Sequence, residues 1–252
     1  MVFIIAHRGC SAEAPENSLA SIKRAIEIGV NYIEIDIHLT KDLVPVVIHD
    51  PNLLRTTNQR SNLEVEKNDL AVLKAFDIGS WYHSDFHNER LPTLDEVLRL
   101  DFKGAKLMIE IKKDLFPAEL IVPQILNVVK KNCDPQLPIP HYLGSFNTAI
   151  VKEIRKEAPT AKTIGILENL ELVDTFLRMK VHTLAIWVKL LNQEIITSLQ
   201  TKGAEIFTFT VNTPEICQEL LNMGIDGIIT DNPLMLKKFM SLAVPGKFGK
   251  QE

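Results

Sequence analysis

Residues 32–50 read YIEIDIHLTKDLVPVVIHD, and they decide how the strands of this chain are counted. Two strand-like runs, 32–39 and 44–50, are separated by only four residues, 40–43. A crossover between parallel strands needs roughly a dozen residues or more. The stretch therefore predicts a hairpin with its turn near Lys41 and Asp42, and the second arm is an antiparallel strand.

The rest of the chain repeats a strand and helix pattern. Further apolar runs occupy 2–7, 106–112, 141–146, 161–167, 183–188, 205–211 and 226–230, and the last five begin about 20 to 22 residues apart. Amphipathic stretches such as 147–157, 194–200 and 214–223 follow them, which is typical of βα units on a parallel sheet. Without the hairpin arm eight parallel strands remain. The sequence thus predicts a (βα)8 TIM barrel, although the pattern does not by itself exclude an open sheet.

The first helix of this pattern has clear ends. Asn17 or Ser18 can cap its first turn, and Gly29 is placed to end it in a left-handed conformation. An apolar stripe of Leu19, Ile22 and Ile26 predicts that one face of this helix is buried.

Residues 51–92 do not follow the repeat. They are polar and loop-rich, and they end in an aromatic cluster, GSWYHSDFHNERLP at 79–92. We interpret them as a small insertion near the catalytic face of the barrel. Trp81, Tyr82 and Phe86 could pack the insertion or line a substrate groove, and packing is favoured. Since no linker is evident, residues 1–252 are expected to form a single domain.

Composition narrows the class of protein. The chain is 46% hydrophobic with a net charge of −4, so no basic surface for nucleic acid is expected. Cys10, Cys133 and Cys217 are too few and too far apart for a disulfide framework, which favours a reducing compartment. The first strand is reached by Phe3, which leaves no room for a signal peptide, and no apolar run approaches the roughly 18 residues of a membrane span. These features predict a cytoplasmic protein; they leave the oligomeric state open, with a homo-oligomer among the options.

Charged and titrating residues interrupt four of the apolar strands near their C-terminal ends. The four pairs are His7 and Arg8, Glu34 and Asp36, His49 and Asp50, and Glu110 and Lys112. Residues two apart on a strand point to the same face. In a TIM barrel the active site lies at the C-terminal ends of the strands, so these side chains are expected to form one site. One such pair alone is common on a surface strand, whereas all four together indicate function.

The hairpin adds His49 to this group. A turn centred on residue 42 places position 36 across from about position 48, which puts His49 beside Glu34 and Asp36. A turn shifted by one residue would point His49 to the other face instead.

The chemistry of these residues suggests a metal centre. Glu34, Asp36 and Glu110 would repel one another and raise their pKa values unless a cation lay between them. A ligand set made only of oxygen atoms suits Mg²⁺ or Ca²⁺. His7 and His49 flank the carboxylates and can serve as general acid and base near neutral pH.

Two fixed cations complete the set. Arg8 and Lys112 supply positive charge for an anionic substrate. A metal, an acid, a base and cations together are what the cleavage of a phosphodiester requires, because the pentavalent state gains charge and the leaving alkoxide must be protonated.

Other polar residues receive simpler interpretations. His38 lies two residues beyond Asp36, and an outer or solvated role is favoured. Cys10 has no base at a suitable spacing, which favours a structural role over a nucleophilic one. The remaining histidines are interpreted as surface or loop residues: His83, His87, His141 and His182.

Longer stretches show a family resemblance. HRG…APENSLASIKRAIEIGVNYIEIDIHLTKDLVPVVIHDPNLLRTT closely resembles the N-terminal signature of glycerophosphodiester phosphodiesterases. The resemblance continues through GSWYHSDFHNERLPTLDEVL, LMIEIK, GSF at 144–146, TFTVNTPE and MGIDGIITDNP. These motifs occur in order and cover nearly the whole chain.

This resemblance implies a TIM barrel that hydrolyses glycerophosphodiesters, as small-molecule substrates, to glycerol 3-phosphate and an alcohol with one divalent cation. Carried over by motif, the metal ligands fall on Glu34, Asp36 and Glu110, the acid and base on His7 and His49, and the phosphate contacts on Arg8 and Lys112. It also implies that the glycerol 2-hydroxyl attacks phosphorus and that the cyclic product is then hydrolysed. The order in which the two histidines act is left open.

Two positions depart from the family pattern. Phe209 stands where a tryptophan usually precedes TVN, so an indole N–H is lost while stacking against the glycerol end of the substrate survives. Leu43 stands where a glycine usually follows Lys-Asp, which makes a turn with positive φ costlier.

Two rival functions are weighed against hydrolysis of a small water-soluble diester. A lysophospholipase D acting on longer lipid substrates would need an apolar groove in the 51–92 insertion to receive an acyl chain. A non-catalytic barrel that binds a glycerophosphate-like ligand is the least favoured, since every acidic, basic and titrating position is present. The sequence does not decide the head-group alcohol or the choice between Mg²⁺ and Ca²⁺.

Overall fold

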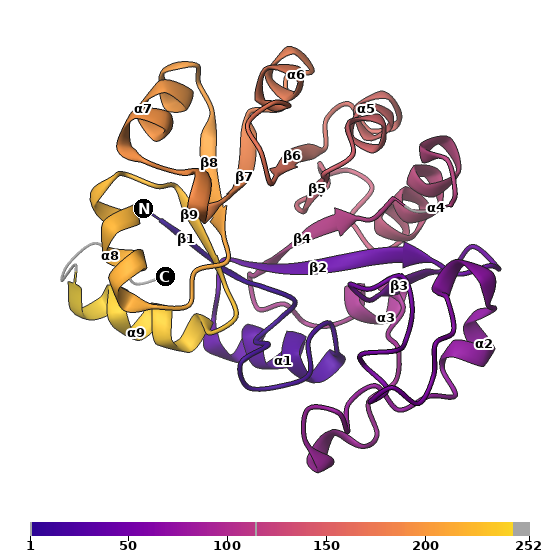
Figure 1. Cartoon of the computed structure of the whole chain (residues 1–252). Coiled ribbons are helices and arrows are strands. Elements are labelled where there is room, and N and C mark those ends of the chain that lie inside the picture. The colour runs from indigo at the N-terminus through magenta and orange to yellow at the C-terminus, as the bar shows by residue number, and fades with distance from the viewer. Residues whose placement is uncertain (1, 114, 244–252) are drawn as a thin grey trace.

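The barrel is closed by parallel strands, as the computed structural model of residues 2–113 and 115–243 shows (Figure 1). Its sheet has the order β1-β9-β8-β7-β6-β5-β4-β2-β3, and a further pairing of β1 with β2 closes it. The strands are β1 (Phe3–Ala6), β2 (Tyr32–Leu39), β3 (Pro45–Val47), β4 (Lys106–Ile111), β5 (Tyr142–Ser145), β6 (Lys162–Leu167), β7 (Thr183–Trp187), β8 (Glu205–Phe209) and β9 (Gly227–Thr230). Only β3 pairs antiparallel among these nine, so eight parallel strands form the barrel. The predicted TIM barrel is confirmed, and the open sheet is excluded.

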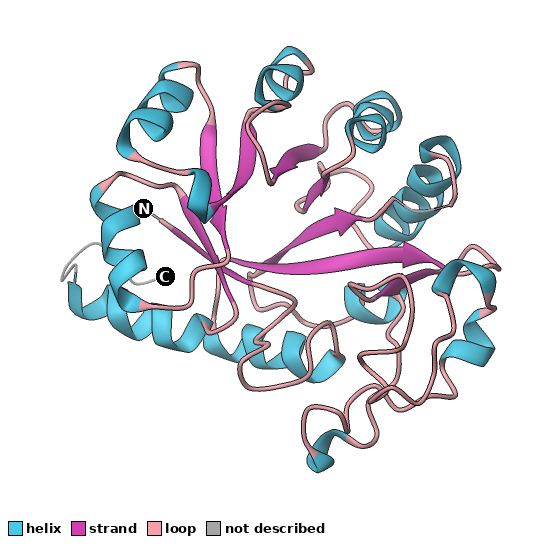
Figure 2. Cartoon of the chain, in the orientation of Figure 1, coloured by secondary structure: helices cyan, strands magenta, loops and turns pink. Residues whose placement is uncertain are grey.

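Helices follow the strands and lie around the outside of the barrel (Figure 2). They are α1 (Leu19–Ile28), α2 (Leu70–Leu73), α3 (Leu94–Leu98), α4 (Ala118–Lys131), α5 (Thr148–Glu157), α6 (Val173–Arg178), α7 (Gln193–Thr201), α8 (Pro214–Asn222) and α9 (Pro233–Ala243). Among the described residues, three short 3-10 turns occur: η1 (Val65–Lys67), η2 (Ser84–Phe86) and η3 (Val188–Leu190). Within the described ranges, none of the helices is long and apolar enough to cross a membrane.

The first helix begins and ends where the sequence indicates. Of the two candidate caps, Ser18 accepts the hydrogen bond from the N–H of Ser21, and Gly29 ends the helix with φ +71°. Asn17 is thereby left for another contact, described below.

The hairpin has the predicted register. Ile37 pairs with Val47, and the N–H of Ile48 donates to the carbonyl of Asp36 at 3.0 Å. Position 36 therefore lies across from position 48. Leu43 takes φ +60° in the turn, so this leucine adopts the left-handed conformation for which glycine is better suited.

Apolar side chains pack on both faces of the barrel sheet. Most of the core lies between the strands and the surrounding helices. A smaller cluster fills the barrel interior: Ile5, Tyr32, Met108, Tyr142, Ile164, Ile166, Ala185, Phe207 and Ile229. Gly227 leaves room for this filling, because a Cβ there would lie 2.6 Å from the ring of Phe207. The interior is thus a packed core, and functional side chains are confined to its ends.

The insertion at 51–92 shares a small core with the β3 arm of the hairpin. The buried members of this core are Val46, Ile48, Leu53, Val65, Leu73 and Leu91. The rings of Trp81 and Tyr82 pack edge to face at 5.9 Å, those of Tyr82 and Phe86 at 5.7 Å, and the indole N–H of Trp81 donates to the carbonyl of Ile78 at 2.8 Å. The aromatic cluster packs the insertion, as favoured from the sequence.

Candidate active site

The charged side chains found in the strands meet at the mouth of the barrel. A cavity of about 490 Å³ lies there, and it opens at the C-terminal ends of the parallel strands. Its lining includes His7, Arg8, Glu34, His49, Glu110, Lys112 and Phe209. Asp36 lies beside them in the acidic cluster. All eight candidate residues are therefore brought to one end of one barrel.

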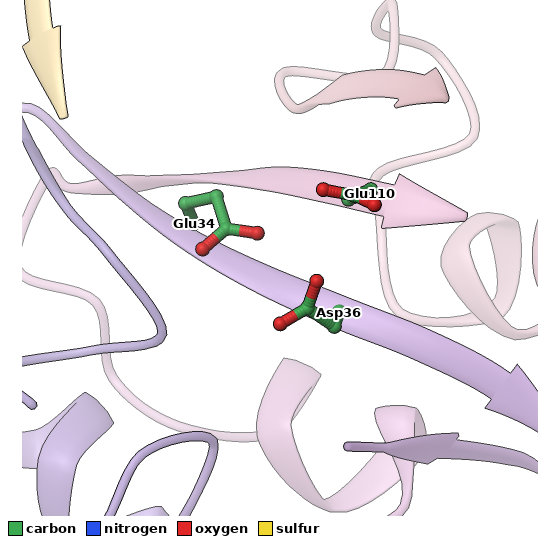
Figure 3. Close-up of side chains that lie close together, drawn as sticks. All are labelled: Glu34, Asp36 and Glu110. Atoms are coloured by element: carbon green, nitrogen blue, oxygen red, sulfur yellow. The ribbon is translucent and has the colours of Figure 1, made fainter. Parts of the chain in front are cut away.

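Three carboxylates form a buried cluster at the centre of this site (Figure 3). Glu34, Asp36 and Glu110 each offer an oxygen atom, and these atoms lie within 4.8 Å of one another. The exposed fractions of the three residues are 3%, 1% and 7%. The strand pairing explains the cluster, because Glu34 and Asp36 share one face of β2 and Asp36 pairs directly with Glu110 on β4.

The cluster holds more negative charge than its neighbours balance. Burial, together with the neighbouring carboxylates, raises the pKa of Glu34 well above its usual value. Burial and Asp36 raise the pKa of Glu110 to about 7. Burial alone would also raise the pKa of Asp36, but Lys112 and Arg8 outweigh it and hold that pKa below its usual range. The arrangement favours the arrival of a further cation.

Protein groups hold Asp36 in place. The Nζ of Lys112 lies 2.8 Å from Oδ1 of Asp36 and also contacts Glu110. The Nε of Arg8 lies 3.3 Å from Oδ2 of Asp36. The amide of Asn17 donates to the same oxygen at 2.8 Å and accepts from the Asp36 N–H at 3.2 Å. Asn17, one of the two candidate helix caps, instead fixes a carboxylate of the cluster.

His7 is held by a residue that sequence reasoning missed. Its Nδ1 lies 2.6 Å from Oδ1 of Asp231, which follows β9. Asn212 donates to the other oxygen of Asp231 at 2.5 Å, and the hydroxyl of Ser11 donates to the first at 3.1 Å. The TDNP motif contains Asp231, but nothing in the sequence pairs that motif with the first strand.

His49 has a carboxylate partner of its own. Its Nδ1 lies 2.7 Å from Oδ1 of Asp50, the next residue in the chain. Burial lowers the pKa of His49, and Lys112 and Arg8 act in the same direction against Asp36 and Asp50.

His38 binds the backbone of the segment that carries His49. It is buried, and its Nε2 donates to the backbone carbonyl of His49 at 3.0 Å. This is the outer role expected for His38.

Arg8 sits on a strained turn that aims it at the cluster. Arg8 has φ +55° and Gly9 has φ +81°. A Cβ at Gly9 would lie 2.4 Å from the hydroxyl of Ser21, so only glycine lets helix α1 approach this closely. The backbone N–H of Arg8 donates to Glu34 at 2.9 Å, and its Nη1 donates to Glu16 at 2.8 Å.

The opposite wall of the cavity is apolar and aromatic. It is lined by Met108, Phe146, Ile166, Trp187, Val188, Phe209, Ile216 and Ile229, with Glu168 and Lys189 at its charged positions. The rings of Phe146 and Phe209 meet edge to face at 6.1 Å. Among the described residues that line this cavity, none comes from the 51–92 insertion. A lipid substrate was expected to need an apolar groove formed by the insertion. The apolar wall of this cavity is not such a groove, because the barrel strands and the segments that follow them form it.

One interpretation of a surface or loop residue holds only for the loop: His141 lies in the loop just before β5 but is buried. His141 is 6% exposed, and its Nδ1 accepts the N–H of Leu107 at 3.1 Å. It lies between the N-terminal ends of β4 and β5, far along the strands from the cavity. His83, His87 and His182 are exposed, as expected.

A barrel with acidic, basic and titrating side chains gathered at its C-terminal mouth defines a TIM-barrel enzyme. The comparisons with known proteins name its family. The model of the glycerophosphoryl diester phosphodiesterase family matches residues 7–235. A glycerophosphodiester phosphodiesterase of Caldanaerobacter subterraneus is 36% identical over 235 residues, which cover 91% of this chain and 94% of that protein. The chain therefore belongs to the glycerophosphoryl diester phosphodiesterase family, and it is an enzyme of the glycerophosphodiester phosphodiesterase class.

Other similar proteins agree with this membership. The structure of an Oleispira antarctica phosphodiesterase in complex with sn-glycerol-3-phosphate as product superposes with a TM-score of 0.89 at 28% identity, covering 95% of this chain and 96% of that one. A human lysophospholipase D is 24% identical over 280 residues, which cover 94% of this chain and 85% of that protein.

Proposed function

We propose that this enzyme hydrolyses small water-soluble glycerophosphodiesters to sn-glycerol 3-phosphate and an alcohol, with a divalent cation at the acidic cluster. The observation that carries the proposal is that a cluster of three buried carboxylates, two of which line the cavity, lies beside two histidines of the same cavity. The product bound in the Oleispira antarctica phosphodiesterase supports glycerol 3-phosphate as a product here.

Glu34, Asp36 and Glu110 fit a hard divalent cation. Their oxygens lie within 4.8 Å of one another, and burial with mutual repulsion raises the pKa values of Glu34 and Glu110. Mg²⁺ and Ca²⁺ both prefer oxygen ligands of this kind. When bound, the cation would act as a Lewis acid that draws charge from a phosphoryl oxygen.

The side chains of Arg8 and Lys112 hold the phosphate. Both line the cavity, and both already lie against carboxylates of the cluster. A guanidinium and an ammonium in a mostly buried site stabilise an anion more strongly than they would in water. Charge that develops on the phosphoryl oxygens is thereby neutralised in the transition state.

His7 and His49 move the protons. Asp231 and Asp50 bind the Nδ1 atoms of the two rings, which leaves each Nε2 free to exchange a proton with substrate. One ring accepts the proton of the attacking glycerol 2-hydroxyl, and the other donates a proton to the leaving alkoxide. The roles reverse when water opens the cyclic phosphodiester.

The apolar wall sets the substrate size. Phe209 and Phe146 present ring surface for the carbon skeleton of the glycerol unit. Of the described residues of the insertion, none lines this cavity and only Pro51 lines the cavity that adjoins it at His49 and Lys112, which favours a short substrate over a lysophospholipid. The human lysophospholipase D among the similar proteins makes the longer substrate the necessary comparison.

The test measures release of choline from glycerophosphocholine and from lysophosphatidylcholine with Mg²⁺, with Ca²⁺ and with a chelator. Glycerol 3-phosphate is assayed as the second product of glycerophosphocholine. We expect turnover of glycerophosphocholine that the chelator abolishes, and losses of several orders of magnitude in kcat for His7→Ala and for His49→Ala with an unchanged melting temperature. Full activity with the chelator would contradict the metal role. Faster turnover of the lysophospholipid would replace the small substrate with the lipid one.

A further inference from the structure

Arg55 lies in the insertion, yet its guanidinium binds two carboxylates next to the active site. Its Nε and Nη2 donate to the two oxygens of Asp50 at 2.8 and 3.0 Å. Its Nη1 and Nη2 donate to the two oxygens of Glu16 at 2.7 and 2.8 Å. Arg55 therefore makes a bidentate contact on each side, which is the geometry that the planar guanidinium fork favours.

Each of these carboxylates also holds a group that faces the substrate cavity. Asp50 accepts from Nδ1 of His49 at 2.7 Å, through the same Oδ1 that accepts from Arg55. Glu16 accepts from Nη1 of Arg8 at 2.8 Å, through the same Oε1 that accepts from Arg55. One guanidinium thus connects an acid-base histidine with a phosphate-binding arginine.

We infer that Arg55 is a positioning residue, which acts through Asp50 and Glu16 to fix the ring of His49 and the guanidinium of Arg8 relative to each other. The inference rests on the proposed function, because it assigns Arg55 to the geometry of that reaction. It also gives the insertion a task, namely to deliver Arg55 to the edge of the site.

The surroundings of Arg55 support a geometric role more than a stabilising one. Its side chain is 40% exposed, and ion pairs at that exposure contribute little to stability. The ring of Trp81 lies 5.8 Å from the guanidinium carbon and limits its movement on the side of the insertion. Without Arg55, Asp50 and Glu16 would lose the group that holds their carboxylates in a single orientation.

Lysine could not do the same work. An ammonium is a point charge and cannot form two parallel hydrogen bonds to each of two carboxylates at once. Arg55→Lys therefore keeps the charge between Asp50 and Glu16 and loses the fixed orientation. The Arg55→Lys variant therefore separates an electrostatic contribution to folding from a positioning effect on the reaction.

The experiment compares Arg55→Gln and Arg55→Lys with Arg24→Gln as a matched control. Arg24 is 38% exposed and pairs with two carboxylates, Glu13 and Glu27, but it binds no residue of the cavity. The kcat and KM for glycerophosphocholine are measured at saturating divalent cation, with melting temperatures for every variant. Asp50→Asn and Glu16→Gln are made alone and combined with Arg55→Gln.

We expect Arg55→Gln to lower kcat by about 10- to 100-fold, as removal of an orienting partner does elsewhere, and to raise KM by several-fold. Asp50→Asn should reproduce mainly the fall in kcat, because it acts on His49, and Glu16→Gln mainly the rise in KM, because it acts on Arg8. Adding Arg55→Gln to Asp50→Asn should lower kcat little further, and adding it to Glu16→Gln should raise KM little further, because each pair then acts on one shared contact. Arg55→Lys should melt like the wild type while kcat remains lowered by about tenfold.

Two results would overturn the inference. One is a pair of kcat and KM values for Arg55→Gln within twofold of those for Arg24→Gln. The other is a kcat loss in the Asp50 double variant, and a KM rise in the Glu16 double variant, each equal to the product of the two single effects, since independent groups act additively in free energy. An inactive wild-type chain would instead contradict the proposed function, so the two failures are distinguishable.

Discussion

The Nδ1 of His7 lies 2.6 Å from Oδ1 of Asp231, although 224 positions separate the two residues in the chain. The contact follows from barrel closure. Ala6 at the end of β1 pairs with Thr230 at the end of β9, and the N–H of His7 donates to the carbonyl of Thr230 at 2.9 Å. The next residue of each strand therefore reaches the same point of the barrel mouth.

Replacing Asp231 by asparagine should slow the reaction without unfolding the barrel. The carboxylate accepts from Nδ1–H of His7 and so fixes the tautomer in which Nε2 faces the cavity. We expect kcat of Asp231→Asn to fall by about 10- to 100-fold with little change in KM. Steady-state kinetics with glycerophosphocholine measure this change.

Asp226 supplies the control for this prediction. It lies at the N-terminal end of β9, where its carboxylate accepts the N–H of Ile206 at 2.8 Å. Asp226→Asn should lower the melting temperature and leave kcat as in the wild type. A kcat of Asp231→Asn equal to that of Asp226→Asn would mean that Asp231 has only a structural role.

Local pattern predicted the fold and the convergence of the candidate site residues at one end of the barrel, because both depend on short-range spacing. The period of two on β2 places Glu34 with Asp36, and the four-residue turn fixes the hairpin register that brings His49 beside them. The partner of His7 could not be predicted in this way. It depends on which strands meet when the barrel closes, and no local spacing records that pairing.

Dependence on tertiary structure also explains why two other features of the structure were not predicted from the sequence. Arg55 reaches Glu16 and Asp50 through the path of an irregular insertion, which has no periodicity to read. His141 was interpreted as a surface or loop residue. It does lie in a loop, but its ring packs against Phe102 and its Nδ1 accepts the N–H of Leu107 at the start of β4. Burial at the N-terminal end of a barrel is decided by tertiary packing.

Divalent cations should stabilise the wild-type chain through the acidic cluster. A ligand that binds only the folded state at 100 times its Kd adds about 2.7 kcal/mol to the free energy of unfolding. We expect Mg²⁺ or Ca²⁺ to raise the melting temperature and a chelator to reverse the rise. Glu110→Gln removes one of the three carboxylates and should abolish the shift.

Glu205 provides a carboxylate at the other end of the barrel for comparison. It accepts hydrogen bonds from the hydroxyls of Tyr142 and Thr183, both at 3.0 Å, and lies at the start of β8. Glu205→Gln should keep the cation-dependent shift whatever its own stability. A shift that persists in Glu110→Gln would place the cation elsewhere.

His141 should make the fold sensitive to acid. Burial, with a smaller effect of Lys106, lowers the pKa of His141 to about 4 from 6.5. Between pH 4 and pH 6.5 the unfolded chain binds more protons than the folded chain. The stability that depends on a neutral His141 is therefore complete above about pH 6.5 and is lost as the pH falls through about 4. The shift corresponds to about 3 kcal/mol. Denaturant unfolding between pH 4 and pH 8, in the presence of a chelator, measures it.

The substitution His141→Asn tests whether titration of His141 causes the loss of stability in acid. The side-chain oxygen of asparagine can still accept the N–H of Leu107, which the neutral ring of His141 accepts at 3.1 Å, but it does not titrate. The free energy of unfolding of His141→Asn should therefore vary less between pH 4 and pH 6.5. His182→Asn, at an exposed position, should keep the wild-type profile. Identical profiles for His141→Asn and the wild type would contradict the prediction.

Three successive helices, α6, α7 and α8, are each followed by a residue in the left-handed conformation, which is glycine in two cases and lysine in the third. After α7, Gly203 has φ +79° and donates to Gln200, and after α8, Gly224 has φ +79° and donates to Leu221. After α6 the equivalent position is Lys180, with φ +59° and a hydrogen bond to Leu177 at 2.9 Å. Glycine is strongly preferred at this left-handed position past a helix end.

Lys180→Gly should therefore stabilise the protein. A residue with a Cβ costs about 1 kcal/mol or more in the left-handed conformation, and the exposed Lys180 side chain has no buried packing to lose. We expect a gain of about 1 kcal/mol, which raises the melting temperature by about 2–4 °C for a chain of this size, with kcat unchanged. The reciprocal change, Gly203→Lys, should destabilise by a similar amount, since a Cβ there meets no atom within 4 Å and backbone strain alone would act. A lower melting temperature for Lys180→Gly would show that the flexibility of glycine in the unfolded chain outweighs the relief of strain.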